Sequence, residues 1–172
     1  GDRHLPPAIA TAKSLLAAAL QGQDMALSSE AGMPAVADPG SSLVRAAHIL
    51  GVPVVPLVGP SSIVLALAAS GLNGQGFVFH DYLPQDVQAR AQRLQELEKA
   101  AHKTGQSQWW IETPYRNAAT LQTMLKVLQP NTLVSIASGL TLEQMQINTN
   151  TVAMLRQQNC QYGEKLPAVF GL

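Results

Sequence analysis

The chain has 172 residues, with 11 Lys and Arg against 11 Asp and Glu, and therefore a formal net charge of zero. Hydrophobic residues make up 47% of it and charged residues only 13%. This balance excludes an intrinsically disordered chain and recognition of nucleic acid through bulk positive charge. Between Arg45 and Asp81 there is no Lys, Arg, Asp or Glu. The densest apolar run there, 63–69, is far shorter than the roughly 20 residues of a membrane span, so we expect a buried segment and no membrane contact.

The single cysteine, Cys160, excludes an internal disulfide and a cysteine-rich metal site. The first residues lack the apolar core and cleavage site of a signal peptide, so a reducing cytoplasm is the expected location. His4, His48 and His102 have no metal-ligand spacing to one another or to Cys160, and we therefore expect no metal.

The first half of the chain alternates helical and strand patterns. Pro6 and Pro7 suit the first turn of a helix, and Asp38 followed by Pro39 is typical of an N-cap and first helical residue. Gly51 is placed to end the second helix. The predicted elements are a helix over 6–21, a strand at 25–28, a loop at 29–39, a helix to residue 50, a buried parallel strand at 52–57 and a helix over 60–71.

The second half repeats the alternation, which predicts an α/β fold with a largely parallel sheet. Trp109 and Trp110 alternate across a strand, so one is expected in the core and the other at a cleft. The Gly- and Asn-rich segment 71–76 is the predicted domain boundary. The predicted elements are strands at 77–79, 109–111 and 133–137, helices at 86–103 and after Thr113-Pro114, and weaker signals for a strand at 144–147, a helix at 152–157 and a strand at 168–171.

Two strand-to-helix turns carry the strongest chemical signal. The first runs from Ser28 to Pro34 and continues to Gly40, and the second runs from Val58 to Ser62. Ligands of parallel α/β sheets bind outside the carboxyl ends of strands, and small residues let the backbone approach a ligand closely. The N–H groups of Ser61 and Ser62 open a helix and could hold a carboxylate or phosphate. The alternative is an ordinary tight turn without a ligand.

Four further side chains are candidates for chemistry. Glu30 lies just past a predicted strand, where it could bind a ribose hydroxyl or act as a base, or be a solvated loop acid. Glu112 follows an apolar strand and is four residues before Arg116, a spacing that allows an ion pair across the turn, either catalytic or structural. Asp38 is interpreted as a helix cap. His80 is interpreted as a strand-end residue, with proton transfer as the alternative.

The segment 29–40, Ser-Glu-Ala-Gly-Met-Pro-Ala-Val-Ala-Asp-Pro-Gly, resembles the S-D-A-G-T-P-x-x-x-D-P-G loop of the tetrapyrrole methylase family. Residues 54–62 with 66–72 resemble its second cofactor segment, 77–84 its F-x-F-x-G-Y-L-P crossing between domains, and 111–116 its F-Y-E-S-P-H-R turn. The matches keep the family's order and cover roughly residues 24–128. They are most similar to the branch of ribosomal small-subunit RNA 2′-O-ribose methyltransferases.

The resemblance implies a two-domain α/β fold with parallel or mixed sheets and helices on both faces, divided into 1–75 and 76–172. It implies S-adenosylmethionine as cofactor, bordered by Gly32, Met33 and Pro34 and held by Gly59, Pro60, Ser61 and Ser62. Because methyl transfer from a sulfonium depends mainly on positioning, the only side-chain chemistry expected is a base for a hydroxyl acceptor, with Glu30 or Glu112 as candidates. A homodimer is also implied.

The sequence departs from the family's pattern at several positions. Glu30 replaces Asp, Met33 replaces Thr, and Ser138–Leu142 stands where the RNA-methylating branch has the charged segment R-E-L-T-K. Family members also open with a strand and glycine-rich turn, so we expect that a first β-α-β unit is missing here. The acceptor is therefore left open between ribosomal RNA and a tetrapyrrole-like small molecule. A non-catalytic binding protein of the same fold and a phosphate- or nucleotide-binding enzyme are the competing hypotheses.

Overall fold

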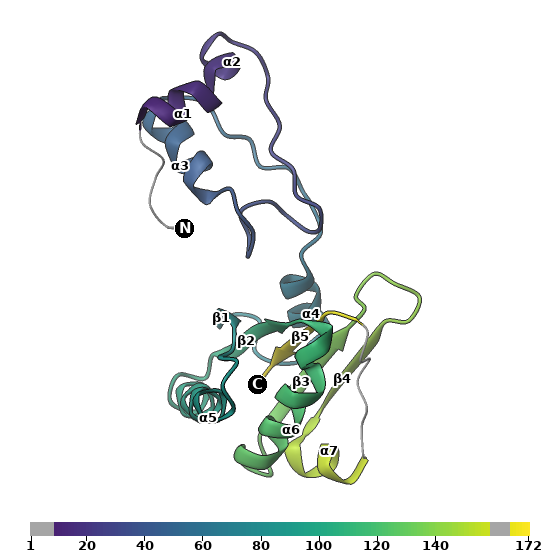
Figure 1. The fold of residues 1–172 in the computed structure, drawn as a ribbon. Coiled ribbons are helices and arrows are strands. Elements are labelled where there is room, and N and C mark those ends of the chain that lie inside the picture. Colours follow the sequence, from purple (N-terminus) through teal and green to yellow (C-terminus); the bar gives the residue numbers. More distant parts are fainter. Residues whose placement is uncertain (1–8, 159–165) are drawn as a thin grey trace. The chain divides into compact units, whose positions relative to one another are not determined.

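The computed structural model describes residues 9–158 and 166–172, and the chain divides into two compact units, Gly1–Ser61 and Ser62–Leu172 (Figure 1). We refer to them as unit 1 and unit 2. Across the described ranges, no helix combines the length and the apolar character needed to cross a bilayer.

The described residues of unit 1, 9–61, form three short helices, α1 (Ile9–Leu15), α2 (Ala17–Leu20) and α3 (Ser41–Ile49). They pack through a small cluster of buried apolar side chains, namely Ala12, Leu16, Ala46 and Ala47. The helix predicted over 6–21 is confirmed within the described residues, with a break at Leu16, whose ψ of 15° departs from helical geometry. Pro6 and Pro7 lie outside the described residues.

The start of α3 corrects one prediction. Asp38 does not cap the helix, because the N-cap residue is Gly40, with a φ of 135° and no side-chain hydrogen bond. That backbone conformation is open to glycine and prevents Asp38 and Pro39 from continuing into the helix, so α3 begins two residues later than predicted. The end of α3 lies where the sequence predicts it, because Gly51 follows the C-cap residue Leu50 with a φ of 71°.

Two predicted strands of unit 1 are not formed. Residues 25–28 and 52–57 are extended segments outside any described sheet. A strand requires hydrogen bonds to a neighbour, and the sheet of the described residues contains strands of unit 2 only. The side chains expected to be buried are exposed as a result, with Val55 at 77% and Leu57 at 79%.

Unit 2 contains a five-stranded sheet in the order β1-β2-β5-β3-β4. Its strands are β1 (Phe77–Tyr82), β2 (Ser107–Glu112), β3 (Leu133–Ser138), β4 (Gln146–Thr151) and β5 (Ala168–Gly171). Only β1 and β2 pair in parallel, while the other three pairings are antiparallel. The prediction of a largely parallel sheet was therefore wrong. The connection between β3 and β4 is too short for a helical crossover, which makes that pair antiparallel.

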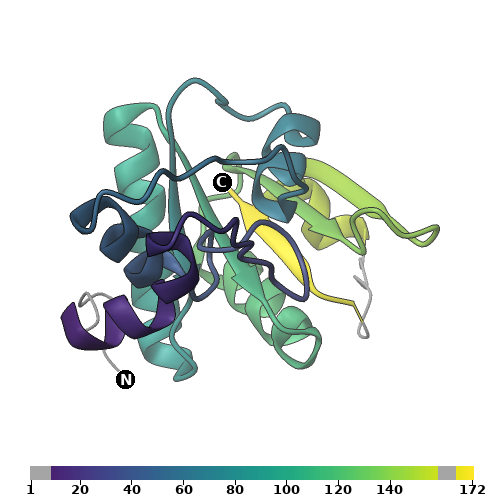
Figure 2. The ribbon, with the colours of Figure 1, turned by 90° about the horizontal axis from the view of Figure 1, so that it is seen from above.

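Helices cover both faces of this sheet, as predicted (Figure 2). On one face lies α4 (Ser62–Ser70). The other face carries α5 (Val87–Thr104), α6 (Asn117–Val127) and α7 (Val152–Gln158), and the 3-10 turn η1 (Pro114–Arg116) precedes α6. The helices and strands predicted from residue 77 onward are all found, with bounds that differ by a few residues; the strand predicted at 144–147, for example, is β4 at Gln146–Thr151.

The longest helix, α5, shows why these boundaries could be predicted. The Asp86 carboxylate accepts a hydrogen bond of 2.8 Å from the Ala89 N–H, which satisfies one of the donors left free at a helix start. Gly105 adopts a φ of 72° and ends the helix in the left-handed conformation. Between the two caps, Leu94 and Leu97 face the core.

Both tryptophans of β2 are fully buried, which corrects the prediction that one of them lines a cleft. Trp110 stacks on Phe170 with ring centroids 5.9 Å apart, on the face covered by α5 and α6. Trp109 packs on the opposite face beneath Ala66 and Leu67 of α4. Since helices cover both faces of β2, neither indole reaches a surface.

Candidate active site

The first predicted turn is held in shape by its own hydroxyl group. The Ser29 side chain lies 3.0 Å from the Ala31 carbonyl oxygen and 2.9 Å from that of Gly32. Gly32 has a φ of 76°, a conformation that L side chains rarely adopt. The backbone around Gly32 is thus fixed and carries no side chain of its own.

The second turn lies directly against the first. A Cβ placed on Gly32 would sit 3.7 Å from the Pro60 carbonyl oxygen, and one placed on Gly59 would sit 3.2 Å from Cγ of Met33. The structure therefore brings together two segments that are almost 30 residues apart in the sequence. Because both contact positions are glycines, the two backbones approach closely.

The backbone between the first turn and α3 is strained. Ala35 and Ala37 have φ values of 63° and 53°, in the left-handed region that disfavours residues with a Cβ. Strained residues of this kind cluster at ligand clamps and active sites, where the surrounding structure enforces them. The strain lies in the segment that the sequence singled out for a ligand.

The last two residues of the second turn belong to different units. Ser61 is buried and is the last residue of unit 1, whereas Ser62 is exposed and begins α4 in unit 2. Glu30, one of the two candidate bases, is exposed in unit 1 beside Gly32. Glu112, the other, belongs to unit 2.

Glu112 ends β2 and is only 2% exposed. Its Oε1 accepts a 3.0 Å hydrogen bond from the Thr120 hydroxyl and one of 3.2 Å from Nη2 of Arg116. Its Oε2 lies 3.2 Å from Nε of Arg116. Burial raises the pKa of the Glu112 carboxyl, and the Thr120 hydrogen bond and the charges of Arg116 and Arg90 oppose that rise.

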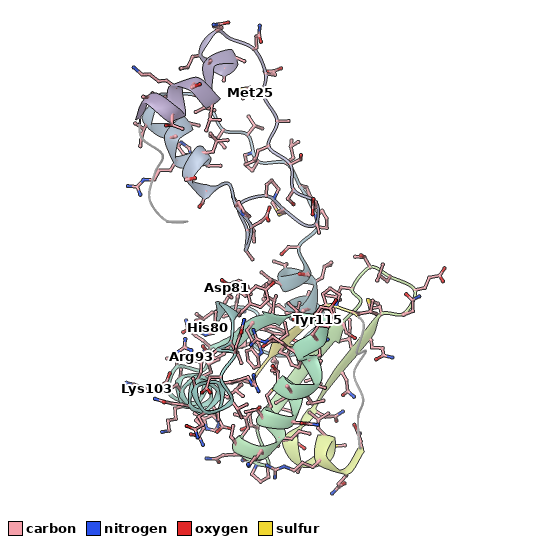
Figure 3. The ribbon with its side chains drawn as sticks, in the orientation of Figure 1. Met25, His80, Asp81, Arg93, Lys103 and Tyr115 are labelled. Atoms are coloured by element: carbon pink, nitrogen blue, oxygen red, sulfur yellow. The ribbon has the colours of Figure 1, made fainter. Side chains whose placement is uncertain are left out.

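The predicted pairing of Glu112 with Arg116 is confirmed. Sequence reasoning missed the third member, Thr120, although its spacing was a usable signal. Thr120 lies four residues after Arg116, at the distance that places two side chains on one face of a helix. Tyr115, which precedes Arg116 and is labelled in Figure 3, is 94% exposed.

His80 lies within β1 and forms hydrogen bonds through both ring nitrogens. Its Nε2 is 2.7 Å from Oε1 of Gln108, and its Nδ1 is 3.2 Å from Nη2 of Arg93 (Figure 3). Because an amide oxygen only accepts and a guanidinium only donates, the arrangement selects the neutral ring protonated at Nε2. Burial lowers the pKa of His80, and the charge of Arg93 lowers it further against the effect of the Gln108 bond.

The segment Ser138–Leu142 follows β3 at the same sheet edge as Glu112. Ser138 and Glu112 both pair with Ala168, on opposite sides of β5. Ser138 is 1% exposed, and its hydroxyl has no hydrogen-bond partner among the described residues. Thr141 has a φ of 72°, unusual for a β-branched residue. The segment thus combines backbone strain with a buried polar group.

The model of the tetrapyrrole (corrin/porphyrin) methylases matches residues 7–155. The chain belongs to the tetrapyrrole methylase family. It is 40% identical over 122 residues to ribosomal RNA small subunit methyltransferase I of Vibrio cholerae, an alignment that covers 71% of this chain and 41% of that protein. The chain spans about half the length of the curated relatives it matches.

Solved structures show the same fold at low sequence identity. The methyltransferase CobJ superposes with a TM-score of 0.59 at 17% identity, over 95% of this chain and 70% of that one. Uroporphyrin-III C-methyl transferase from Thermus thermophilus, solved with S-adenyl homocysteine, gives a TM-score of 0.51 at 14% identity, over 99% of this chain and 73% of that one. This member of the tetrapyrrole methylases therefore has the family's α/β fold, with a mixed sheet in unit 2.

Within residues 9–158 and 166–172, no group of three or more His, Cys, Asp and Glu side chains is arranged to hold a metal ion. His4 and Cys160, two of the residues considered at the sequence level, lie outside these ranges.

Proposed function

We propose that this tetrapyrrole methylase transfers the methyl group of S-adenosylmethionine to small-subunit ribosomal RNA, at a ribose 2′-hydroxyl. The observation that carries the proposal is the contact between the Gly32–Met33 and Gly59–Pro60 turns in unit 1. These are the two segments that the family resemblance assigns to the cofactor. The RNA acceptor is supported by the relatives that are named ribosomal RNA small subunit methyltransferase I.

The two turns fit a compact zwitterionic cofactor. Glycines at both contact positions leave peptide groups accessible, and no Lys, Arg, Asp or Glu occurs between Arg45 and Asp81. Peptide dipoles can hold a sulfonium and an amino-acid moiety without side-chain charge. We assign Gly32, Met33, Pro34, Gly59, Pro60, Ser61 and Ser62 to this role. Bound S-adenosylmethionine supplies a methyl group already activated on a sulfonium sulfur.

A hydroxyl acceptor must lose its proton, and we assign this step to Glu30. Its carboxylate is exposed and two residues from Gly32, so it is accessible to an acceptor at the first turn. Glu112 fits a different role. Its carboxylate is buried and held by Thr120 and Arg116, so we propose it as a positioning residue for the turn after β2.

We further propose that unit 1 forms part of a cofactor domain, that the two-domain organisation of 1–75 and 76–172 holds, and that the protein is a homodimer. The dimer is supported by the family resemblance and by exposed apolar side chains in the charge-free stretch, including Val55, Leu57 and Val58.

Calorimetry with S-adenosylmethionine tests the cofactor site. The Gly59→Val side chain would collide with Met33 and separate the two turns, so we expect binding weaker by roughly 5- to 150-fold, which corresponds to the 1–3 kcal/mol of an overpacked contact. Gly74→Val is the matched control, because a Cβ at Gly74 meets nothing within 4 Å. Wild-type protein that binds neither the cofactor nor its demethylated product would contradict the proposal.

A methyl-transfer assay tests the reaction. Labelled S-adenosylmethionine is supplied with small-subunit RNA, with total small metabolites, or with protein as acceptor. Label in ribose 2′-O-methyl groups of the RNA supports the proposal, and Glu30→Gln should then lower the rate at unchanged cofactor affinity. Label in a small molecule would replace RNA by a tetrapyrrole-like acceptor. Cofactor binding without label in any pool would favour the non-catalytic binding protein.

A further inference from the structure

A hollow of about 530 Å³ lies beside the last turns of α5, far along the helix from the Glu112 pair. It is lined by Gln95, Glu98, Lys99, His102, Lys103, Val127 and Gln129, and we call it the α5 hollow. Since α5 follows β1 and ends just before β2 begins, its last turns lie at the edge where the two strands start. The candidate active-site residues of unit 2 lie at the opposite edge, where β2 ends.

Positive charge gathers in this hollow. Lys99, His102 and Lys103 follow one another at the spacing of one helix face, and all three are exposed (Lys103 is labelled in Figure 3). Like charges four residues apart oppose each other in a helix. The ion pairs of the described residues lie elsewhere, at Arg93–Glu96 and Glu112–Arg116, and neither Lys99 nor Lys103 takes part in them.

The only acidic side chain of the hollow, Glu98, is already engaged by the protein. It is 6% exposed, and its Oε1 accepts hydrogen bonds from the Gln129 N–H at 2.9 Å and from the Thr132 hydroxyl. These bonds join α5 to the connection between α6 and β3, so Glu98 builds the wall of the hollow. The exposed charges that face a ligand are those of the lysines and, when protonated, His102.

We propose that the α5 hollow binds a phosphate group, and that its source is the backbone of the RNA substrate. Two lysine ammonium groups and the amide donors of Gln95 and Gln129 suit phosphate oxygens. Basic side chains that neutralise phosphates supply most of the sequence-independent affinity of a protein for RNA. The phosphate site follows from the hollow itself, whereas its source rests on the proposed function.

Titration with inorganic phosphate, followed by NMR of the His102 ring and the amides of residues 95–105, tests the site. We expect saturable shifts in the wild type that vanish in Lys99→Gln/Lys103→Gln. The control Lys13→Gln/Lys126→Gln removes two exposed lysines that do not line the hollow and should retain the shifts. A wild type without saturable shifts, or a double variant that retains them, overturns the site. If the lysines serve only the dipole of α5, the double variant will melt earlier but bind phosphate unchanged.

Filter binding of a small-subunit RNA fragment at several salt concentrations tests the source. Removing two phosphate contacts should lower the slope of log affinity against log salt by about 1.5 and weaken binding roughly tenfold near 0.1 M salt. If Lys13→Gln/Lys126→Gln loses as much affinity for the RNA fragment, the loss reflects only the lower net positive charge, and the proposed RNA contact at the α5 hollow is wrong. If the wild type and Lys99→Gln/Lys103→Gln transfer methyl groups to RNA at equal rates, the proposed role of the α5 hollow is wrong, while the proposed function is not affected. Phosphate binding without any RNA binding would identify a free anion as the ligand and contradict the proposed substrate.

Discussion

Arg116 Nε lies 3.2 Å from Oε2 of Glu112, and the same guanidinium donates from Nη2 to the carbonyl oxygen of Leu83 at 2.6 Å. Arg116 therefore ties the end of β2 to the loop that follows β1. The side chain of Glu112 is fully buried and that of Arg116 is 19% exposed. A buried ion pair of this kind stabilises little by its existence but costs much when one partner is removed.

Arg116→Met should lower the free energy of unfolding by about 3 kcal/mol, because it leaves the Glu112 carboxylate buried without its cation. Urea denaturation measures the change. Adding Glu112→Gln in the same chain should recover part of the loss, since it removes the uncompensated charge. Glu96→Gln is the control, because Glu96 pairs with Arg93 at the surface, where such pairs contribute about 0.5 kcal/mol. Equal losses in the two single variants would contradict a special role for Arg116.

The protonation of Glu112 predicts a pH dependence of stability. Burial raises the pKa of its carboxyl in the folded state above that of the unfolded chain. The folded protein then binds the proton more tightly, so the contribution of Glu112 is fully present below about pH 4.3. It is lost as the pH rises through the folded-state pKa. Relative to Glu112→Gln, the wild type should gain stability on acidification from neutral pH, and the difference between the two urea midpoints at each pH measures this. If the advantage of the wild type over Glu112→Gln instead grows toward neutral pH, burial does not raise the pKa of Glu112 and the prediction is wrong.

The helices and strands of unit 2 and the helices of unit 1 could be predicted from local signals, while the two strands predicted in unit 1 do not form. From Phe77 onward, caps such as Asp86 and Gly105 and the alternation of apolar residues fix each element where it forms. In unit 1, Val52–Leu57 has an equally strong strand pattern, but a strand depends on a hydrogen-bonded neighbour that the described residues do not provide. The strand directions in unit 2 escaped prediction for a related reason, because where β5 inserts into the sheet depends on contacts distant in the sequence.

The parts of the candidate site that consist of residues close together in the sequence could be predicted. The spacing of Glu112 and Arg116 predicted their ion pair, and the two glycine turns were found from composition and resemblance. The contact of Gly59 with Met33 could not be predicted, since it depends on how 25 intervening residues fold. The α5 hollow was also not foreseen, because Gln129 joins Lys99 there only through the packing of α6 on α5.

His80 should titrate below the ordinary histidine range of about 6.5. Burial and the charge of Arg93 lower the pKa of His80 in the folded state. The contribution of His80 to the free energy of unfolding is therefore present above about pH 6.5 and is lost as the pH falls through the folded-state pKa. NMR titration of the ring protons measures the midpoint. Arg93→Gln should raise the midpoint, because it removes a cation 3.2 Å from Nδ1.

Asp81 adopts a φ of 60° at the position where the family's F-x-F-x-G-Y-L-P pattern has glycine. An aspartate in the left-handed region carries a strain that glycine does not, partly offset by the larger entropy of glycine in the unfolded chain. Asp81→Gly should therefore stabilise the protein by about 0.5 kcal/mol, whereas the β-branched Asp81→Val should destabilise it by about 1–2 kcal/mol. Thermal unfolding of both variants measures this order, and a valine variant as stable as the glycine variant would show that the loop relaxes freely.

Gly171 lies opposite Trp109 across β5 and β2, and a Cβ at Gly171 would meet the indole at 2.7 Å. Trp109 is fully buried and packs against Ala66 and Leu67 of α4, so the ring cannot move aside without displacing core side chains. Gly171→Ala should lower the free energy of unfolding by about 2 kcal/mol, the usual size of an overpacking penalty. Gly74→Ala, where a Cβ meets nothing within 4 Å, should change it by less than about 0.5 kcal/mol. Trp109→Phe should cost less stability in the Gly171→Ala chain than in the wild type, because the smaller ring leaves room for the new methyl group, whereas in both chains it removes the hydrogen bond from the indole N–H to Ser107. Urea midpoints of the wild type, the two single variants and the double variant measure this difference, and an equal cost in both chains would show that the indole is not the group being displaced.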